Sequence, residues 1–150
     1  MKKPLDTATV TQVAIVVRDI EKSAQVFAEF LGLPVPQIKP TGTLDVALTR
    51  YRGKPTEARA KLAFFDIGQG LRLELIEPDE HPSTWREYLD EHGEGVHHIA
   101  FGIKGMKEKI GRLEAEGMPL VQTGEYKGGR YAYIDAVGKL KTVIELLEND

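Results

Sequence analysis

Cysteine is absent from this chain of 150 residues. Its absence excludes disulfide bridges, zinc sites built on thiolates, and catalytic thiol nucleophiles. No apolar run approaches the ~18 residues that a membrane-spanning helix requires. The first residues, MKKPLDTATV, also lack the apolar core of a signal peptide. We therefore expect a cytoplasmic protein that does not insert into a membrane.

An excess of positive charge is missing as well, because the net charge is -3. This balance gives no reason to expect nucleic acid or an anionic membrane as a partner. Hydrophobic residues make up 41% and charged residues 29% of the chain, which is typical of a globular protein. The length suits one ordinary domain, which we expect to span residues 1–150.

The chain repeats its own pattern. When Gln12–Pro34 is aligned with His98–Pro119, Gln12 falls on His98, an offset of 98 − 12 = 86. Each copy begins as an apolar strand, continues as an amphipathic helix of period 3.6, and ends at a glycine. The two halves also end alike, with LELIE at Leu73–Glu77 and IELLE at Ile144–Glu148.

Further strand-like runs complete each half, at Leu44–Tyr51 and Ala60–Ile67 in the first and at Pro119–Thr123 and Gly129–Asp135 in the second. The pattern predicts an α+β fold of two β-α-β-β-β modules, the first at about residues 10–78 and the second at about 96–148. A helix at about 83–92 bridges them, with capping-box spacing between Thr84 and Glu87. The proline-rich segment 34–42 predicts a mobile loop or the rim of a cleft.

Side chains alternate between the two faces of a strand. Bulky residues therefore share one face of each leading strand and should pack under the helix: Val13, Ile15 and Val17 in the first copy, Ile99, Phe101 and Ile103 in the second. Gln12 and His98 lie on the opposite face, followed by smaller residues that leave room for a ligand. By the same alternation His97 points away from His98, so we expect it to be a packing or supporting residue.

The closing strand of each module carries a glutamate within an apolar run, Glu74 in the first and Glu145 in the second. A buried carboxylate without a partner costs several kcal/mol or more, so each needs compensation. Arg72 shares a face with Glu74 and could supply it. Glu77 and Glu148 have the other parity and lie near strand ends, so we expect them to be exposed.

Gln12, Glu74, His98 and Glu145 thus occupy two pairs of equivalent positions in the repeat. If an approximate twofold axis relates the modules, the four side chains can converge. One imidazole, two carboxylates and one amide oxygen suit a divalent metal ion, with Co, Ni, Zn, Mn and Mg not distinguished. Taken singly, each residue has an ordinary explanation, as a core histidine or a solvated glutamate. The hypothesis rests on their shared placement.

The chain resembles the vicinal oxygen chelate superfamily, which includes glyoxalase I, methylmalonyl-CoA epimerase, extradiol dioxygenases and fosfomycin-resistance proteins. The segments that carry the resemblance are QVAIVVRDIEKSAQVFAEFLGL, LRLELIEP, GEGVHHIAF and TVIELLE. The resemblance implies paired βαβββ modules that form a cupped mixed sheet around a divalent metal. It also implies that Gln12, Glu74, His98 and Glu145 are the metal ligands.

GEGVHHIAF looks most like the epimerase branch, although the HPK…GG pattern of that branch is absent. A glutamine at the first ligand position is similar to some glyoxalase I enzymes. The dioxygenase and fosfomycin branches use two histidines and one carboxylate, which this chain does not offer. We therefore expect a methylmalonyl-CoA epimerase-like isomerase. A glyoxalase I-type lyase and a non-catalytic drug-binding protein are the alternatives.

In the epimerase interpretation, the metal stabilises an enolate while Glu145 removes the α-proton and Glu74 acts as its partner. No organic cofactor is needed. The substrate is an acyl-CoA thioester, and we expect a homodimer. Cations that could meet the CoA moiety are Lys127, Arg130, Lys139 and Lys141.

Overall fold

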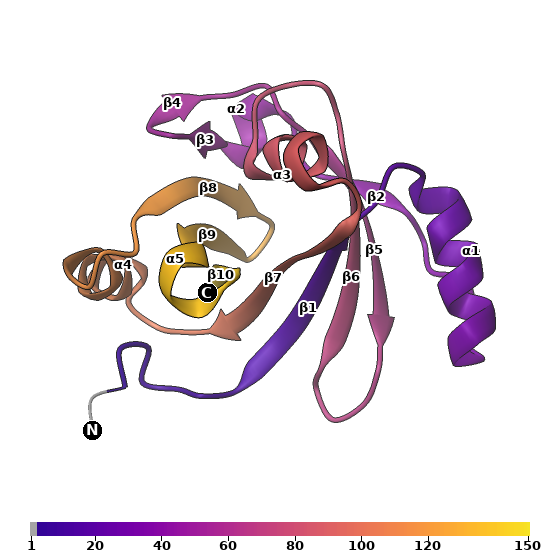
Figure 1. Cartoon of the computed structure of the whole chain (residues 1–150), viewed down its shortest axis with the longest axis horizontal. Helices are drawn as coiled ribbons and strands as arrows, with labels where there is room; N and C mark the ends of the chain where they lie inside the picture. The colour runs from indigo at the N-terminus through magenta and orange to yellow at the C-terminus, as the bar shows by residue number, and fades with distance from the viewer. Residues whose placement is uncertain (1–2) are drawn as a thin grey trace.

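The computed structural model describes residues 3–150, in which ten strands form one curled sheet (Figure 1). The strands are β1 (Val10–Val16), β2 (Lys39–Pro40), β3 (Arg50–Tyr51), β4 (Lys54–Pro55), β5 (Ala60–Asp66), β6 (Arg72–Pro78), β7 (Gly95–Gly102), β8 (Leu120–Tyr126), β9 (Gly129–Asp135) and β10 (Val143–Asn149). The helices are α1 (Ile20–Leu31), α2 (Leu44–Ala47), α3 (Thr84–His92), α4 (Met106–Ala115) and α5 (Val137–Leu140). None of these helices is long and apolar enough to cross a membrane.

The predicted internal repeat is visible in the order of the strands, which runs β2-β5-β6-β1-β7-β10-β9-β8-β3-β4. In the first module β1 pairs in parallel with β6, and in the second β7 pairs in parallel with β10. The modules meet where β1 and β7 pair antiparallel within the same chain. Gln12 is paired with Ala100, and Ala14 with His98. The repeat exchanges these two pairs, so an approximate twofold axis passes between β1 and β7.

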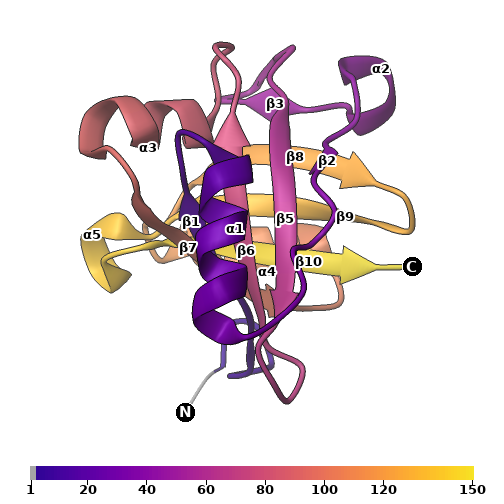
Figure 2. The ribbon, with the colours of Figure 1, turned by 90° about the vertical axis from the view of Figure 1, so that its right-hand side faces the viewer.

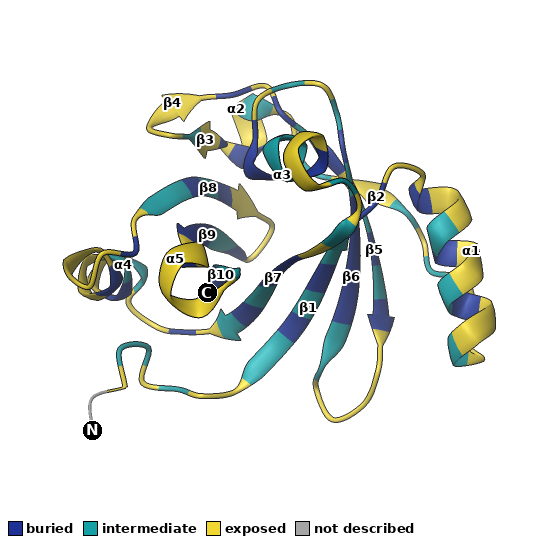
Figure 3. Cartoon of the chain, in the orientation of Figure 1, coloured by how far each residue is buried: buried dark blue, intermediate teal, exposed yellow. Residues whose placement is uncertain are grey.

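The long repeat helices cover the convex side of the sheet. Helix α1 lies over β5 and β6 (Figure 2), and its inward side is buried while its outward side is exposed (Figure 3). Ile15 and Val17 pack beneath it, as strand parity predicted. The Asp19 side chain accepts a hydrogen bond from Lys22 N at its start. Gly32 ends it with φ 67°, a conformation that glycine adopts without a steric penalty.

The expectation that Glu77 and Glu148 are exposed was wrong. Glu77 Oε1 accepts the Ile20 N–H at 3.0 Å, at the start of α1. Glu148 Oε2 accepts the Gly105 N–H at 2.7 Å, at the start of α4. The two carboxylates therefore close the free N–H groups of equivalent helices, where a negative charge is favourable. Strand parity assigned each glutamate to the correct face of the sheet. It could not predict that a helix N-terminus would lie beside the carboxylate on that face.

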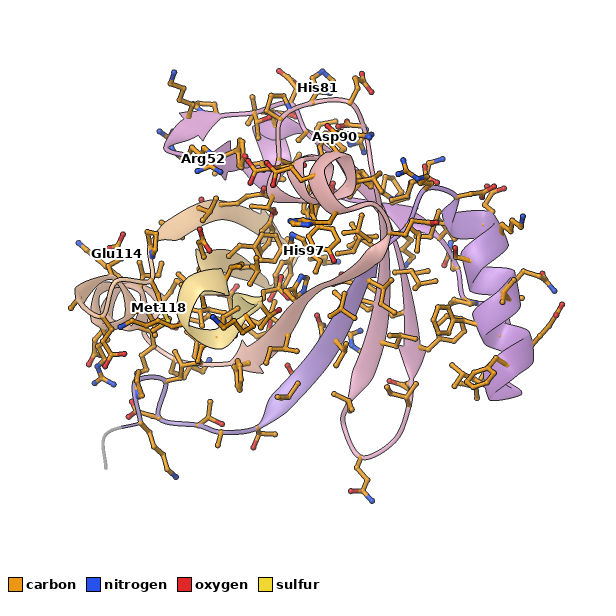
Figure 4. The ribbon with its side chains drawn as sticks, viewed as in Figure 1. Arg52, His81, Asp90, His97, Glu114 and Met118 are labelled. Carbon is orange, nitrogen blue, oxygen red and sulfur yellow. The ribbon has the colours of Figure 1, made fainter. Side chains whose placement is uncertain are left out.

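The predicted strand at Leu44–Tyr51 was also wrong, because this segment contains α2 and only the short β3. Leu44, Val46 and Leu48 alternate as a strand does, but Leu48 has a φ of 49°, which ends the helix and turns the chain. The segment forms an arm that leaves the first module at β2 and pairs through β3 with β8 of the second. The arm residue Arg52 (Figure 4) forms an ion pair of 2.8 Å with Glu87 in α3.

The predicted bridging helix is confirmed as α3. Its N-cap is Ser83, whose side chain accepts from Arg86 N at 3.0 Å, one residue earlier than the predicted capping box. Trp85 and Leu89 pack against Ala14 and Val16 on the concave side of the sheet. Helix α3 therefore fills one end of the concave side, and the remainder stays open as a cavity.

Candidate metal site and cavity

A cavity of about 690 Å³ occupies the open part of the concave face. Both modules line it, through Gln12 and Glu74 of the first and Glu145 and Tyr133 of the second. The segment Lys39–Gly42, from the proline-rich stretch, also lines it, which confirms the prediction of a cleft rim. The volume lies within the range typical of small-molecule sites.

The buried cluster of the site consists of His98, Glu74 and Glu145. His98 Nε2 lies 3.1 Å from Glu145 Oε1 and 3.4 Å from Glu74 Oε1. The imidazole is fully buried and each glutamate is 5% exposed. Residues from β6, β7 and β10 thus meet at one point, as the repeat predicted that they would.

The facing atoms of this cluster are close but are not hydrogen-bonded. His98 Nε2, Glu74 Oε1 and Glu145 Oε1 are buried without a hydrogen-bond partner among the described residues, since their short separations lack hydrogen-bond angles. Ligand atoms of these three residues all lie within 4.8 Å of one another. Convergent lone pairs of this kind fit a divalent cation with nitrogen and oxygen ligands, and a cation would remove the cost of leaving them unpaired.

The electrostatics of the protein alone point the same way. Burial lowers the pKa of His98, but the Glu145 and Glu74 carboxylates outweigh it and raise that pKa to about 9. Burial, together with the charge of Glu145, raises the pKa of Glu74 against the opposing effect of His98. The cluster therefore needs a positive charge at its centre, which either a proton or a metal ion supplies.

Gln12 is 5% exposed and lines the same cavity as the two glutamates. It stands beside Arg72 in the register of β1 and β6, whereas Ala14 stands beside Glu74. On the other side of the axis, Glu145 stands beside Ala100. The small side chains Ala14 and Ala100 thus separate the polar ones, which leaves the volume that the sequence predicted. Gln12 therefore faces the same cavity as the buried cluster.

His97 does not point away from His98, so this part of the parity argument was wrong. Ala14 pairs with His98 but Ile15 pairs with Val96, so His97 is the extra residue of a β-bulge. Its ring is buried between β7 and α3 (Figure 4), and its centroid lies 5.6 Å from that of Tyr88. His97 Nδ1 lies 2.8 Å from His98 Nδ1. Burial and the charge of His98 lower the pKa of His97 well below its ordinary value.

Arg72 does not compensate Glu74 through an ion pair, which was the alternative explanation for that glutamate. Its guanidinium lies over the Phe64 ring, 4.1 Å from the centroid, and it lines the cavity. Within residues 3–150, no carboxylate oxygen lies within ion-pair distance of it. Of the four cations suggested for a CoA moiety, only Lys127 lines the cavity. Arg130 is paired with Glu148, and Lys139 and Lys141 donate to backbone carbonyls.

Sequence reasoning missed an aromatic wall formed by α3 and β9. Trp85, Tyr131 and Tyr133 line the cavity, and the Tyr131 and Tyr133 ring centroids lie 5.0 Å apart. The Tyr133 centroid also lies 4.9 Å from that of His98. The alternation in GRYAYID could have indicated that both tyrosines share one face. It could not indicate that α3 would supply a hydrogen-bonding partner from outside the sheet.

Comparison with known proteins gives a family match over most of the chain. The profile of the Glyoxalase/Bleomycin resistance protein/Dioxygenase superfamily matches residues 11–134. The uncharacterized protein YqjC of Bacillus subtilis (strain 168) is 30% identical over 95 residues, which cover 61% of this chain and 67% of that protein.

Solved structures show the same fold at low sequence identity. Methylmalonyl-CoA epimerase from Mycobacterium tuberculosis superposes with a TM-score of 0.63 at 22% identity, covering 94% of this chain and 87% of that one. A hypothetical protein from Bacillus halodurans C-125 has a TM-score of 0.66 at 21% identity, covering 95% and 94%. A methylmalonyl-CoA epimerase in complex with methylmalonyl-CoA and NH4+ has a TM-score of 0.62 at 18% identity, covering 93% of each chain.

Proposed function

The chain belongs to the glyoxalase/bleomycin resistance protein/dioxygenase superfamily, and we propose that it is a metal-dependent isomerase acting on an acyl-CoA thioester. The observation that carries the proposal is the buried cluster of His98, Glu74 and Glu145, whose unpaired donor atoms converge beside a cavity. A site built for packing alone would not leave three polar atoms buried and unsatisfied.

In this proposal His98, Glu74 and Glu145 hold the metal ion, with Gln12 as a fourth ligand. When bound, the ion supplies Lewis-acid polarisation of the thioester carbonyl and favours the enolate. The chain itself shields the cluster from bulk water, since all four residues are at most 5% exposed. Their placement on strands of one continuous sheet keeps the ligand geometry fixed before substrate arrives.

Proton transfer falls to the two glutamates. They come from opposite modules and both line the cavity. Each turns Oε1 toward His98, which leaves Oε2 to exchange a proton with the substrate. We assign Glu145 as the base that removes the α-proton and Glu74 as the acid that returns one to the other face.

Three cations support an anionic, CoA-bearing substrate. Lys39, Arg72 and Lys127 line the cavity, and none of them is ion-paired with another described residue. Arg72 is the innermost in register, beside Gln12, and can bind a carboxylate of the acyl group. Two lysines at the rim suit phosphates. Structural neighbours of this chain include epimerases in complex with methylmalonyl-CoA and with 2-nitronate-propionyl-CoA.

A glyoxalase I-type lyase is the second candidate, because Gln12 stands where some of those enzymes have glutamine and because the same carboxylates would serve enediolate chemistry. Binding of a drug without catalysis is less consistent with this site. A cavity for an apolar drug has no use for two buried carboxylates and an imidazole at its floor.

The proposal is tested by incubating the purified protein with methylmalonyl-CoA in deuterated water. We expect deuterium to enter C2 without an organic cofactor, and we expect a chelator to abolish the exchange and divalent metal to restore it. If the protein converts a hemithioacetal but exchanges no deuterium into any acyl-CoA, the lyase proposal replaces the epimerase proposal. If the protein has neither activity and contains no metal when purified, non-catalytic binding of a small molecule is the remaining function.

A further inference from the structure

The hydrogen bonds of the aromatic wall have a fixed direction. Gln122 is 1% exposed, and its Oε1 accepts the backbone N–H of Thr84 at 2.9 Å. A backbone N–H can only donate, so the amide oxygen must face Thr84 and the amide nitrogen must face the other way. Gln122 Nε2 lies 3.0 Å from the Tyr131 hydroxyl and donates to it. The Tyr131 oxygen is therefore an acceptor on the side of the wall.

The same direction holds for the hydrogen bond to Tyr133, two residues further along β9. The indole N–H of Trp85 lies 2.9 Å from the Tyr133 hydroxyl, and an indole nitrogen can only donate. The Tyr133 oxygen is therefore also an acceptor from the wall. No residue of the described chain accepts a hydrogen bond from either hydroxyl. Both phenolic protons are thus left for whatever occupies the cavity that these residues line.

We propose that Tyr131 and Tyr133 form a pair of neutral hydrogen-bond donors that bind the oxygen anion formed from the substrate during the reaction. The inference rests on the proposed function for the identity of that anion, an enolate oxygen. The donors are directed before substrate binds, because Gln122 and Trp85 occupy the other side of each hydroxyl. Preorganised donors of this kind stabilise developing charge without reorganisation.

The position of the pair supports this role. Tyr133 is paired with Glu145 in the register of β9 and β10, so one donor stands beside the assigned base. Tyr131 stands two residues along, and its ring lies over Gly124 of β8. A Cβ at Gly124 would come within 2.4 Å of that ring. The ring can therefore lie at this position only because residue 124 is a glycine. With a larger residue at position 124, the Tyr131 ring could not pack against β8 with its hydroxyl next to Gln122.

The tyrosines also stay protonated. A phenol ordinarily has a pKa of about 10, so both hydroxyls carry their protons near neutral pH. They donate hydrogen bonds and need not transfer protons. In this scheme the base takes the α-proton, the electron pair moves onto the carbonyl oxygen, and the two O–H groups meet the negative charge that appears there.

The first test removes the hydroxyls alone. Tyr131→Phe and Tyr133→Phe keep both rings, and each should lower kcat for deuterium exchange into methylmalonyl-CoA by roughly 100-fold with little change in KM, as loss of an oxyanion donor does. Tyr51→Phe is the control, since its hydroxyl bonds Glu87 outside the cavity and the Arg52–Glu87 ion pair remains. An unchanged kcat, or a change confined to KM, overturns the proposal. Thermal unfolding checks that each variant is folded.

The second test does not need an acyl-CoA, so it separates failure of this pair from failure of the proposed function. The purified protein, with and without added divalent metal, is titrated with 4-nitrophenol, whose absorbance reports the bound phenolate. Each Tyr→Phe variant should bind the phenolate about tenfold or more weakly, as expected for a lost hydrogen bond to a charged group. Equal affinity in wild type and variants, or no binding by wild type, overturns the pair.

Gln122→Glu reverses one bond without changing the shape of the wall. The carboxylate still accepts from Thr84 N but can no longer donate, so it accepts the Tyr131 proton and withdraws it from the cavity. We expect the same loss of kcat and of phenolate affinity as in Tyr131→Phe. Wild-type values in a folded Gln122→Glu protein would mean that the direction of this bond is irrelevant and would overturn the assignment of Tyr131.

Discussion

Gln12 and His98 occupy the same position in the two modules and are exchanged by the axis between β1 and β7, where Gln12 is paired with Ala100 and Ala14 with His98. The two positions are equivalent in backbone but not in chemistry, because one carries an amide and the other an imidazole. The fold is symmetric and the donor set is not. This asymmetry gives the first prediction.

Gln12→His should keep the site intact and change which metal it prefers. An amide oxygen is a neutral hard donor, whereas imidazole favours later transition metals. Nickel or zinc binding should therefore tighten relative to magnesium, measured by competition titration of the metal-free protein. Unchanged selectivity would place Gln12 outside the ligand set. Gln25→His, on the exposed side of α1, controls for adventitious binding to a new histidine.

His97 should matter for metal binding although it is not a predicted ligand. Its Nδ1 lies 2.8 Å from His98 Nδ1, so a proton shared between these atoms orients the His98 ring and leaves His98 Nε2 free to bind metal. His97→Phe keeps a ring against Tyr88 but removes this bond. We expect about 10–100-fold weaker metal binding, as for other groups that orient a ligand.

Two control variants should lose more and less metal affinity than His97→Phe. His98→Ala should lose more affinity, because it removes a ligand. His92→Ala should lose none, because His92 is exposed at the end of α3. Calorimetric titration with zinc checks all three. If His97→Phe binds like wild type, the bulge serves packing only.

Glu148 should stabilise the protein in a pH-dependent way. The Gly105 N–H lowers its pKa, and Arg130 and the Met106 N–H add to this against the effect of desolvation. A carboxylate with a lowered folded-state pKa stabilises above its ordinary value of 4.5, and the contribution is lost as pH falls through the folded-state value. Glu148→Gln should thus lower Tm by roughly 2–4 °C at pH 7.

The difference in Tm between wild type and Glu148→Gln should shrink below pH 4.5 as the wild-type carboxyl is protonated. Differential scanning calorimetry between pH 3 and pH 7 measures it. Glu114→Gln, on the exposed side of α4 (Figure 4), is the matched control and should leave Tm unchanged at every pH. A difference independent of pH would mean that Glu148 acts through its shape and not its charge.

The sequence predicted the repeat, both long helices and the convergence of His98, Glu74 and Glu145, because period and parity survive wherever a strand ladder is regular. The errors fall where regularity stops. At His97, a β-bulge interrupts the alternation, so the ring does not point away from His98 as parity predicted. Leu48 has a left-handed backbone conformation, which the alternation of apolar and polar residues cannot predict. The direction of the Gln122 bond depends on Thr84 N, a contact made only once α3 docks against the sheet.

The roles of the two glutamates can be separated with a single epimer of methylmalonyl-CoA. If Glu145 removes the proton from one face and Glu74 returns it to the other, Glu145→Gln should abolish exchange for the epimer whose α-proton faces Glu145, by about 10²–10⁴-fold. It should keep most of its metal, because the amide oxygen can still serve as a ligand.

Glu74→Gln should behave differently with that same epimer. Glu145 still removes the proton, and only Glu145 can return one, so deuterium enters C2 without inversion. With the opposite epimer the two variants exchange their behaviour. Mass spectrometry of the product, combined with a stereospecific coupling enzyme, measures exchange and inversion separately. If one variant loses exchange with both epimers while the other keeps exchange with both, a single carboxylate carries out every proton transfer and the two-glutamate assignment is wrong. Loss of both signals in both variants, with metal retained, would mean that one carboxylate cannot act without the other.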